Sequence, residues 1–192
     1  MGKVKYLNEV LSLTGKSQVV TVDSIRKVAG PKYAHLLLHN LVRRKVLHRI
    51  TRGCYSRLDD PTLAVFCFQP AYLGLENALS INNLWEQETN PIILTTMKIR
   101  QGSRNVFGSN VMLRRIPAGY CFGFEYVPYG STYVPASDPE KTLIDLVYFR
   151  HSIQPEVLMA VRRKIDSVKL KKYLHRYESA FARLFARATG LP

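Results

Sequence analysis

The sequence predicts an α+β protein, with a small, mainly helical domain over residues 1–58 and a larger mixed domain over residues 59–192. Three observations support this fold class. Apolar residues recur at helical spacing in three early segments, two short alternating stretches follow them, and Tyr, Phe, Val and Gly are dense over residues 106–135. With 46% hydrophobic residues in 192, the chain is long and apolar enough to bury one or two sizeable cores.

Three helices are expected in the first domain. Val4, Leu7 and later apolar residues recur at a helical period, so the first helix covers about residues 3–14. The second is capped by Thr21 or Asp23, whose side chains accept from free backbone N–H groups, and it ends at Gly30. Proline suits a first helical turn, so the third helix runs from Pro31 to about Lys45.

A β-hairpin should follow the third helix. Residues 46–50 alternate like a strand, residues 51–53 form a turn that Gly53 allows to close, and residues 54–56 are extended again. The second and third helices are separated by only a few residues. The order of three helices and a hairpin therefore predicts a winged helix-turn-helix, a fold that reads the major groove of double-stranded DNA with its third helix.

The residues expected to contact DNA lie beside the apolar stripe of the third helix and on the hairpin. Residues early in the recognition helix face base edges, and basic side chains on the wing reach the phosphate backbone or the minor groove. The predicted contacts are Lys32, Tyr33, His35, His39, Arg43, Arg44, Arg49 and Arg52.

Charge is concentrated at the two ends of the chain. The 28 Lys/Arg and 14 Asp/Glu residues give a net charge of +14, and residues 61–140 hold only 5 of the basic residues. A field of this sign attracts polyanions. The basic C-terminal helices are expected to be either a solvated face or a further contact to nucleic acid, through Arg162, Arg163, Lys164, Lys169, Lys171 and Lys172.

The second domain should combine two short helices (62–68 and 73–81), a buried strand (91–96) and several antiparallel strands (106–135). A further helix should then start at Ser137 or Asp138, with Glu140 completing a capping box, and Leu143, Ile144, Leu146 and Val147 should form its apolar face. Basic helices are expected to end the chain.

No enzymatic activity, metal or cofactor is expected. Phosphate-binding glycine loops and nucleophile-elbow motifs are absent from the sequence. His35 and His39 have i, i+4 spacing but no acidic or cysteine partner nearby. A metal-dependent nuclease built from Asp138, Glu140 and Asp145, with Lys141 between them, remains as an alternative because clustered carboxylates can hold divalent cations.

Cytoplasmic location without a membrane span is also expected. No apolar run approaches the ~20 residues that cross a bilayer, and the first ten residues lack the apolar core of a signal peptide. The odd set of cysteines, Cys54, Cys67 and Cys121, predicts three reduced thiols.

Three segments together resemble the AbiEi-type antitoxins of type IV toxin–antitoxin systems. They are residues 41–55 at the end of the third helix and the hairpin, residues 70–80 with the strand 92–96 after them, and residues 136–146. The segments occur in the family order. The sequence departs from the pattern at Lys45-Val46, where the family often has a glycine, and at Asn77 and Thr142, where smaller residues are usual.

The resemblance implies a repressor that binds its own promoter and an antitoxin-like second domain. Its partner would be a nucleotidyltransferase-like toxin, which the family is expected to neutralise without necessarily forming a stable complex with it. The alternative is a stand-alone winged-helix transcription factor whose second domain senses a ligand or mediates dimerisation. Either protein would act as a monomer, or as a homodimer on a palindromic site.

Overall fold

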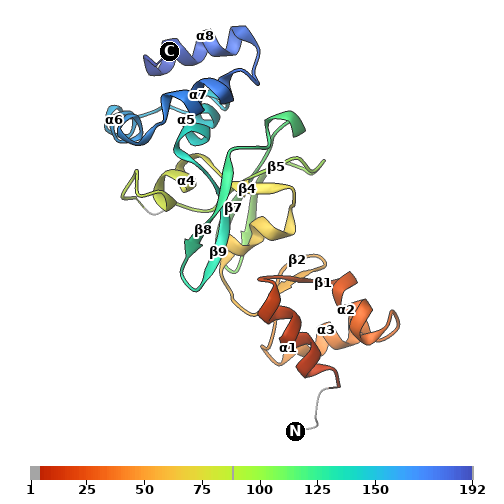
Figure 1. Cartoon of the computed structure of the whole chain (residues 1–192). Coiled ribbons are helices and arrows are strands. Elements are labelled where there is room, and N and C mark those ends of the chain that lie inside the picture. Colours follow the sequence, from red (N-terminus) through yellow and green to blue (C-terminus); the bar gives the residue numbers. More distant parts are fainter. Residues whose placement is uncertain (1–4, 88, 192) are drawn as a thin grey trace. The chain divides into compact units, whose positions relative to one another are not determined.

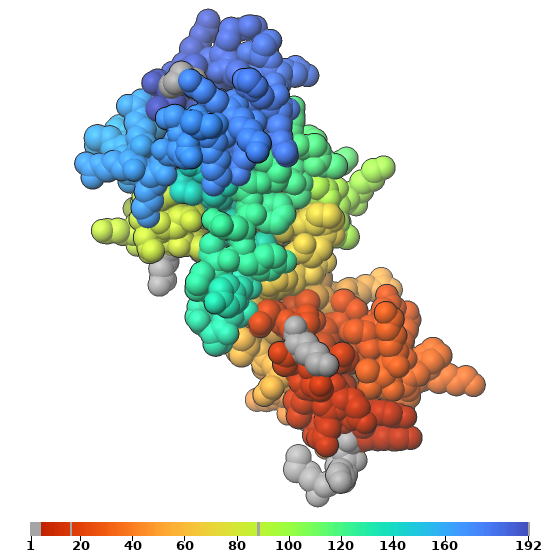
Figure 2. Space-filling view, viewed as in Figure 1, coloured from red at the N-terminus to blue at the C-terminus, as the bar shows by residue number. Residues whose placement is uncertain are grey.

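The computed structural model describes residues 5–87 and 89–191, which form two compact units. The first contains residues up to Phe68 together with Asn105–Asn110, and the second contains Gln69–Arg104 and the chain from Val111 onward. Figure 1 labels most of the helices and strands of each unit, and Figure 2 shows the same view in space-filling form, coloured along the chain in the same way. Each unit is described by itself.

The first unit contains three helices and a three-stranded antiparallel sheet. The sheet has the order β1-β3-β2, so the two strands of the hairpin are joined by a short strand from between the first two helices. The elements are α1 (Leu7–Lys16), β1 (Val20–Thr21), α2 (Val22–Ala29), α3 (Ala34–Arg43), β2 (His48–Thr51), β3 (Cys54–Ser56) and the 3-10 helix η1 (Pro61–Cys67).

Thr21 is the residue that begins α2. Its Oγ1 accepts from the backbone N–H of Ser24 at 3.2 Å, and Ser24 Oγ accepts in return from the backbone N–H of Thr21 at 2.9 Å. This reciprocal capping box satisfies two donors that the helix itself leaves unpaired. Asp23, the other predicted cap, instead lies in the first turn, where its charge favours the positive end of the helix dipole.

Helix α3 is shorter at both ends than the predicted range of Pro31–Lys45. Residues 31–33 form a turn before it, and Tyr33 is its N-cap. At the other end Lys45 has a φ of 57°, and the N–H of Val46 returns to the carbonyl of Leu41 at 2.9 Å. This hydrogen bond closes the helix, and it requires a left-handed residue at position 45.

Replacing Lys45 with glycine is expected to stabilise the first unit by about 1 kcal/mol, because glycine adopts a positive φ without the steric penalty of a Cβ. Denaturant unfolding followed by far-UV circular dichroism would measure the change. Arg44→Gly is the matched control, since Arg44 has an ordinary φ of −84° and glycine should be destabilising there. Equal destabilisation by both variants would contradict the prediction.

Cys54 and Cys67 form a disulfide, so the expectation of three reduced thiols is wrong. Cys54 is buried on β3, and η1 packs against β2 beside it, which brings the two cysteines together across 13 residues of sequence. Cys121 is the free cysteine among the described residues. The disulfide and the packing of η1 also place residues 59–68 in the first unit rather than in the second.

The second unit is built on a six-stranded sheet in the order β6-β7-β5-β4-β9-β8. Its sheet is mixed, which corrects the prediction of an antiparallel sheet: β4 pairs in parallel with β9, and β5 pairs in parallel with β7. The connections that allow parallel pairing are longer than hairpin turns. The strands are β4 (Ala71–Leu73), β5 (Ile92–Thr95), β6 (Gly102–Val106), β7 (Ser109–Arg115), β8 (Phe124–Tyr129) and β9 (Thr132–Ser137).

Helix α5 (Pro139–Tyr148) is the centre of the helical part of this unit. It contacts four other helices, and its predicted apolar residues Leu143, Ile144, Leu146 and Val147 are all buried. Asp138 caps it by accepting from the N–H of Lys141 at 2.8 Å. The remaining elements are α4 (Leu75–Ile81), the 3-10 helix η2 (Ala118–Tyr120), α6 (Pro155–Lys164), α7 (Ser167–Leu174) and α8 (Ser179–Thr189).

Glu140 does not complete the predicted capping box. Asp138 is the N-cap, so Glu140 lies two residues after it rather than three and cannot reach back to the cap residue's N–H in the usual way. Its carboxylate instead accepts from the backbone N–H of Asp166 at 2.7 Å, which holds the start of α7 against α5.

Candidate nucleic-acid interface

Three predicted contact residues lie along one exposed face of α3. His35, His39 and Arg43 are spaced four residues apart, which places them on one side of a helix, and all three are exposed. Leu37, Leu38 and Leu41 are buried on the opposite side, within the core of the first unit. The stripe that faces the core therefore fixes which side chains α3 presents to solvent.

Lys32 and Tyr33 lie in the turn before α3, not on the helix itself. Lys32 is exposed. Tyr33 is half-buried, packs against the core of the first unit, and has its ring 6.1 Å from the ring of Tyr6. Its ring therefore supports the turn that positions Lys32.

The hairpin presents two more predicted residues. Arg49 is exposed on β2, opposite Tyr55, and Arg52 is exposed in the turn that Gly53 closes with a φ of 81°. Arg44 is also exposed, directly after α3. The predicted role of Gly53 in closing this turn is confirmed, since a left-handed conformation favours glycine.

Most of these basic side chains remain electrostatically uncompensated. Lys32, Arg43, Arg49 and Arg52 form no ion pair with any residue that the structure describes. The Nε2 atom of His35 lies 3.3 Å from a guanidinium nitrogen of Arg26. The charge of Arg26 is itself neutralised by an ion pair with Asp23 at 2.8 Å. The surface of α3 and the hairpin is thus open to an anionic ligand.

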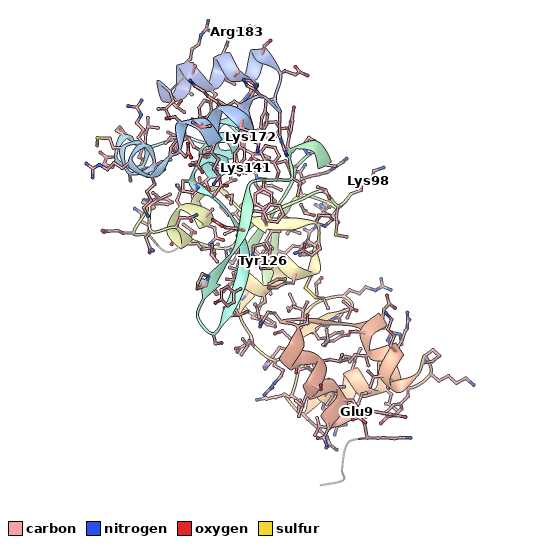
Figure 3. The ribbon with its side chains drawn as sticks, in the orientation of Figure 1. Glu9, Lys98, Tyr126, Lys141, Lys172 and Arg183 are labelled. Carbon is pink, nitrogen blue, oxygen red and sulfur yellow. A yellow bond between two sulfur atoms is a disulfide. The ribbon has the colours of Figure 1, made fainter. Side chains whose placement is uncertain are left out.

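The six basic residues predicted near the C-terminus divide into two groups. Three have intramolecular partners: Arg162 donates to the carbonyl of Thr189, Lys164 donates to the carbonyl of Asn82 at 2.8 Å, and Lys169 pairs with Asp138 and Glu140 at 3.0 and 3.2 Å. Although burial opposes it, the two carboxylates raise the pKa of Lys169. The other three are exposed and form no ion pair with a described residue: Arg163, Lys171 and Lys172, the last of which is labelled in Figure 3.

A buried polar cluster lies between α5 and the sheet of the second unit. Lys141 and Asp145 are fully buried and form an ion pair, Tyr72 donates its hydroxyl to Asp145 at 2.8 Å, and Lys141 Nζ donates to the hydroxyl of Tyr177 at 3.2 Å. The ammonium also lies 5.2 Å from the ring centroid of Phe122. Figure 3 labels Lys141 at the centre of the second unit, among side chains from several elements.

Burial governs the ionisation of this cluster. It lowers the pKa of Lys141 and raises the pKa of Asp145, and in each case the opposite charge of the partner counteracts the shift. Burial and the Asp145 carboxylate raise the pKa of Tyr72 well above its usual value, and they also raise that of Tyr177. The cluster is a satisfied structural network enclosed by aromatic rings.

The three carboxylates of the nuclease alternative do not converge on one site. Asp138 caps α5 and accepts from the hydroxyl of Tyr173 at 2.8 Å, Glu140 binds the start of α7, and Asp145 is enclosed in the buried cluster. No group of three His, Cys, Asp or Glu side chains is placed to hold a metal ion in residues 5–87 and 89–191.

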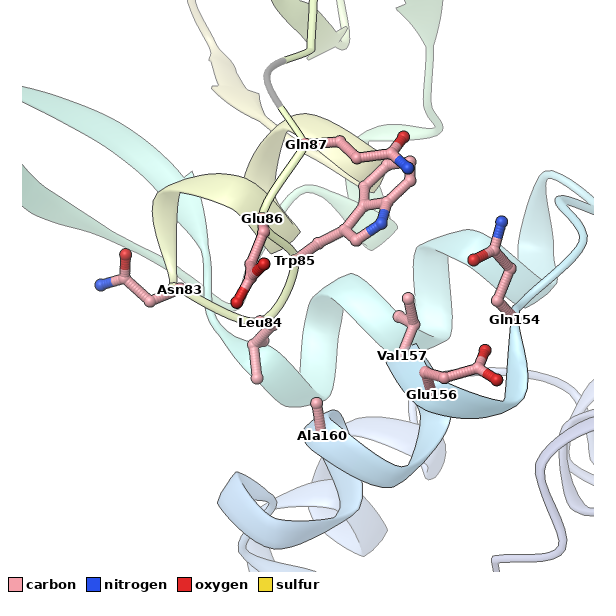
Figure 4. A pocket seen from close by; sticks show the side chains of 9 residues that line it. All are labelled: Asn83, Leu84, Trp85, Glu86, Gln87, Gln154, Glu156, Val157 and Ala160. Atoms are coloured by element: carbon pink, nitrogen blue, oxygen red, sulfur yellow. The ribbon is translucent and has the colours of Figure 1, made fainter.

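An open cavity of about 660 Å³ lies between the loop after α4 and the start of α6 (Figure 4). Trp85 forms one wall, and the polar ends of Glu86, Gln87, Gln154 and Glu156 surround its mouth. Val157 and Ala160 supply an apolar floor from α6. Its volume lies within the range of small-molecule sites, but its lining is more polar than is usual for such sites.

The comparisons with known proteins establish a likeness of fold. No family model matches the sequence, and no curated protein matches it. The structure is similar to the crystal structure of the RV2827C protein from Mycobacterium tuberculosis, with a TM-score of 0.58 and 15% identity over 96% of this chain and 76% of that chain. At this identity the similarity concerns the fold alone.

Two features were missed by reasoning from the sequence. The Lys141–Asp145 pair has i, i+4 spacing on a helix whose other residues are largely apolar, and this pattern could have indicated a buried ion pair. The aromatic residues around it come from distant segments, and no local pattern connects them.

Among the described residues, no helix has both the length and the apolar character needed to cross a membrane.

Proposed function

We propose that the chain is a sequence-specific DNA-binding repressor whose first unit is a winged helix-turn-helix. The observation that carries this proposal is the set of exposed basic side chains without an ion pair in the turn before α3, at the end of α3 and on the β2–β3 hairpin: Lys32, Arg43, Arg49 and Arg52. In this reading α3 enters the major groove, the hairpin is the wing, and Arg49 and Arg52 contact the backbone or the adjacent minor groove. The target is double-stranded DNA of its own promoter.

Antitoxin activity is the second part of the proposal. It is supported by the resemblance of residues 70–80, 92–96 and 136–146 to AbiEi-type antitoxins. These segments form β4 with α4, β5, and β9 with α5, which contact one another in the middle of the second unit. The function that the resemblance favours is neutralisation of a nucleotidyltransferase-like toxin, without a lasting complex, by a protein of the cytoplasm.

The direct test is a gel-shift titration of the full chain against its own upstream DNA, with random DNA as competitor and salt varied. We expect preferential binding and a steep loss of affinity with salt, because each neutralised phosphate releases counterions. The double variant Lys32→Ala/Arg52→Ala should bind at least about tenfold more weakly, as two charged contacts are removed.

Arg183→Ala/Arg187→Ala is the matched control for this test. It removes two charges from exposed positions of α8, of which Arg183 is labelled in Figure 3, and should leave affinity within about twofold of the parent. Equal, weak binding of the parent to promoter and random DNA would refute sequence-specific recognition. Rescue of growth on co-expression with an adjacent toxin gene would test the antitoxin part separately.

The cavity beside Trp85 favours a second candidate function, a transcription factor whose second unit senses a small molecule. Trp85 is the single tryptophan of the chain, so its fluorescence reports directly on this cavity. A metabolite that changes this fluorescence and also weakens promoter binding would favour the sensor. The antitoxin would be favoured if no such ligand altered promoter binding and the chain rescued growth of cells that express the toxin.

A further inference from the structure

The middle of the sequence is almost neutral, but its positive charges are gathered in one place. All five Lys/Arg residues of the segment 61–140 lie between residues 98 and 115, and no Asp or Glu occurs from residue 89 to residue 124. In the structure these positions belong to β6, to the loop before it, and to the end of β7. A neutral average therefore conceals a strongly basic region of the second unit.

Strand β6 is one edge of the six-stranded sheet. Arg104 lies on this strand, Lys98 and Arg100 lie in the loop before it, and Arg115 ends the neighbouring strand β7. Arg104 donates to the carbonyl of Arg100 at 2.7 Å, and Gln101 accepts from the backbone N–H of Arg115 at 3.0 Å. The first contact holds the loop before β6 against β6 itself, and the second holds this loop against the end of β7. The four residues that we call the basic edge are Lys98, Arg100, Arg104 and Arg115.

The basic edge is accessible and uncompensated. Lys98, Arg100 and Arg115 are exposed, Arg104 is half-buried, and Figure 3 shows Lys98 extending away from the ribbon. None of the four forms an ion pair with a residue that the structure describes. On the C-terminal helices Lys169 is neutralised by two carboxylates, whereas Arg163, Lys171 and Lys172 are exposed and form no ion pair with a described residue.

We propose that the basic edge binds the phosphate backbone of double-stranded DNA, as a second contact surface besides α3 and the hairpin. This inference rests on the proposed function. A group of cations, three of them exposed and none paired with a described carboxylate, is suited to a polyanion, and phosphate contacts need no base-specific geometry. Proteins that bind single strands stack bases on aromatic rings. Residues 97–106 include no aromatic side chain, and the ring of Phe107, which follows them, packs edge-on against His48 with 6.1 Å between the ring centroids. The chemistry therefore favours a duplex.

Two sites on one chain would act together on one DNA molecule. Once the first unit is bound, the second site meets phosphates at a high effective concentration, so weak contacts there still raise the overall affinity. These contacts carry no sequence information. They should strengthen binding to promoter and random duplexes by the same factor.

The test uses the full chain with the double variant Lys98→Ala/Arg100→Ala and fluorescence anisotropy on promoter and random duplexes. We expect an affinity loss of about tenfold on both duplexes, and a salt slope lower by about 2, as two phosphate contacts disappear. The matched control is Arg183→Ala/Arg187→Ala, which removes the same charge from exposed positions of α8 and should change affinity less than about twofold.

Other outcomes overturn the proposal in distinguishable ways. Unchanged duplex affinity in Lys98→Ala/Arg100→Ala, while Lys32→Ala/Arg52→Ala weakens binding, would refute the basic edge and keep the proposed function. Equal losses in the basic-edge variant and the α8 control would mean that only net charge matters. Stronger binding to single strands than to duplexes, lost in the variant, would refute the duplex assignment. If Lys98→Ala/Arg100→Ala lost duplex affinity and Lys32→Ala/Arg52→Ala did not, the winged-helix interface would be refuted instead.

Discussion

Replacing Lys141 with methionine is expected to lower the free energy of unfolding of the second unit by about 3–5 kcal/mol. Lys141 and Asp145 are both fully buried, and methionine fills a similar volume without a charge. The variant therefore leaves the Asp145 carboxylate in the interior with only the Tyr72 hydroxyl as a partner. An uncompensated buried charge costs several kcal/mol because it has lost both water and its counter-ion.

Trp85 allows this prediction to be measured on the second unit by itself, because the chain's single tryptophan lies there. Urea unfolding followed by its fluorescence should show the midpoint falling in Lys141→Met. The double variant Lys141→Met/Asp145→Leu should recover much of the loss, since no buried charge remains. Removing a buried pair together is much less costly than removing one member.

Lys172→Met is the matched control, since it removes an exposed lysine from α7 in the same helical layer. Lys172 forms no ion pair with a residue that the structure describes, so its replacement should change the free energy of unfolding by about 0.5 kcal/mol or less. A loss below about 1 kcal/mol in Lys141→Met would show that the buried pair does not hold α5 in place. A double variant as unstable as the single one would show that lost packing, rather than the charge, is responsible.

The sequence alone predicted the local features of α5 but not its surroundings. Its cap at Asp138 and its apolar face follow from spacing along one helix, and both are confirmed. Tyr72 and Tyr177, which complete the network around Lys141, lie 73 and 36 residues away from their partners. Contacts at this separation depend on how strands and helices pack, which short-range patterns do not encode.

In the sheets too, contacts between residues close in the sequence were predicted, and contacts between distant residues were not. The β2–β3 hairpin was predicted because two adjacent alternating stretches and Gly53 specify an antiparallel turn. The parallel pairing of β4 with β9 was missed, since it joins residues 73 and 136, and alternation gives no information about strand direction. The basic edge was missed for a different reason, because net charge was averaged over a long segment.

The two ends of α3 show where local rules compete. Pro31 is compatible with a first helical turn, but Gly30 and the packing of Tyr33 place a separate turn before the helix begins. Lys45 is a good helix former, yet it adopts a left-handed conformation because the hydrogen bond from Val46 to Leu41 closes the helix there. Helix existence was therefore predicted better than helix boundaries.

Reducing the Cys54–Cys67 disulfide is expected to lower the stability of the first unit by about 3 kcal/mol. The cross-link closes a loop with a sequence separation of 13, and opening it gives the unfolded chain more conformations. Unfolding followed by far-UV circular dichroism, with and without a dithiol reductant, would measure the loss. The Trp85 fluorescence transition of the second unit should not move, because both cysteines belong to the first unit.

Two variants make this experiment specific. Cys67→Ser removes the cross-link at a half-buried position and should reproduce the reduced parent, whereas Cys121→Ser removes the free thiol and should leave the transition of the oxidised first unit unchanged. Equal midpoints for the oxidised and reduced parent, with the thiol state verified by mass, would contradict the prediction. Because Cys54 lies on β3, which pairs with β2 beside the exposed Arg49, loss of the cross-link should also weaken the proposed DNA binding at temperatures where the unit partly unfolds.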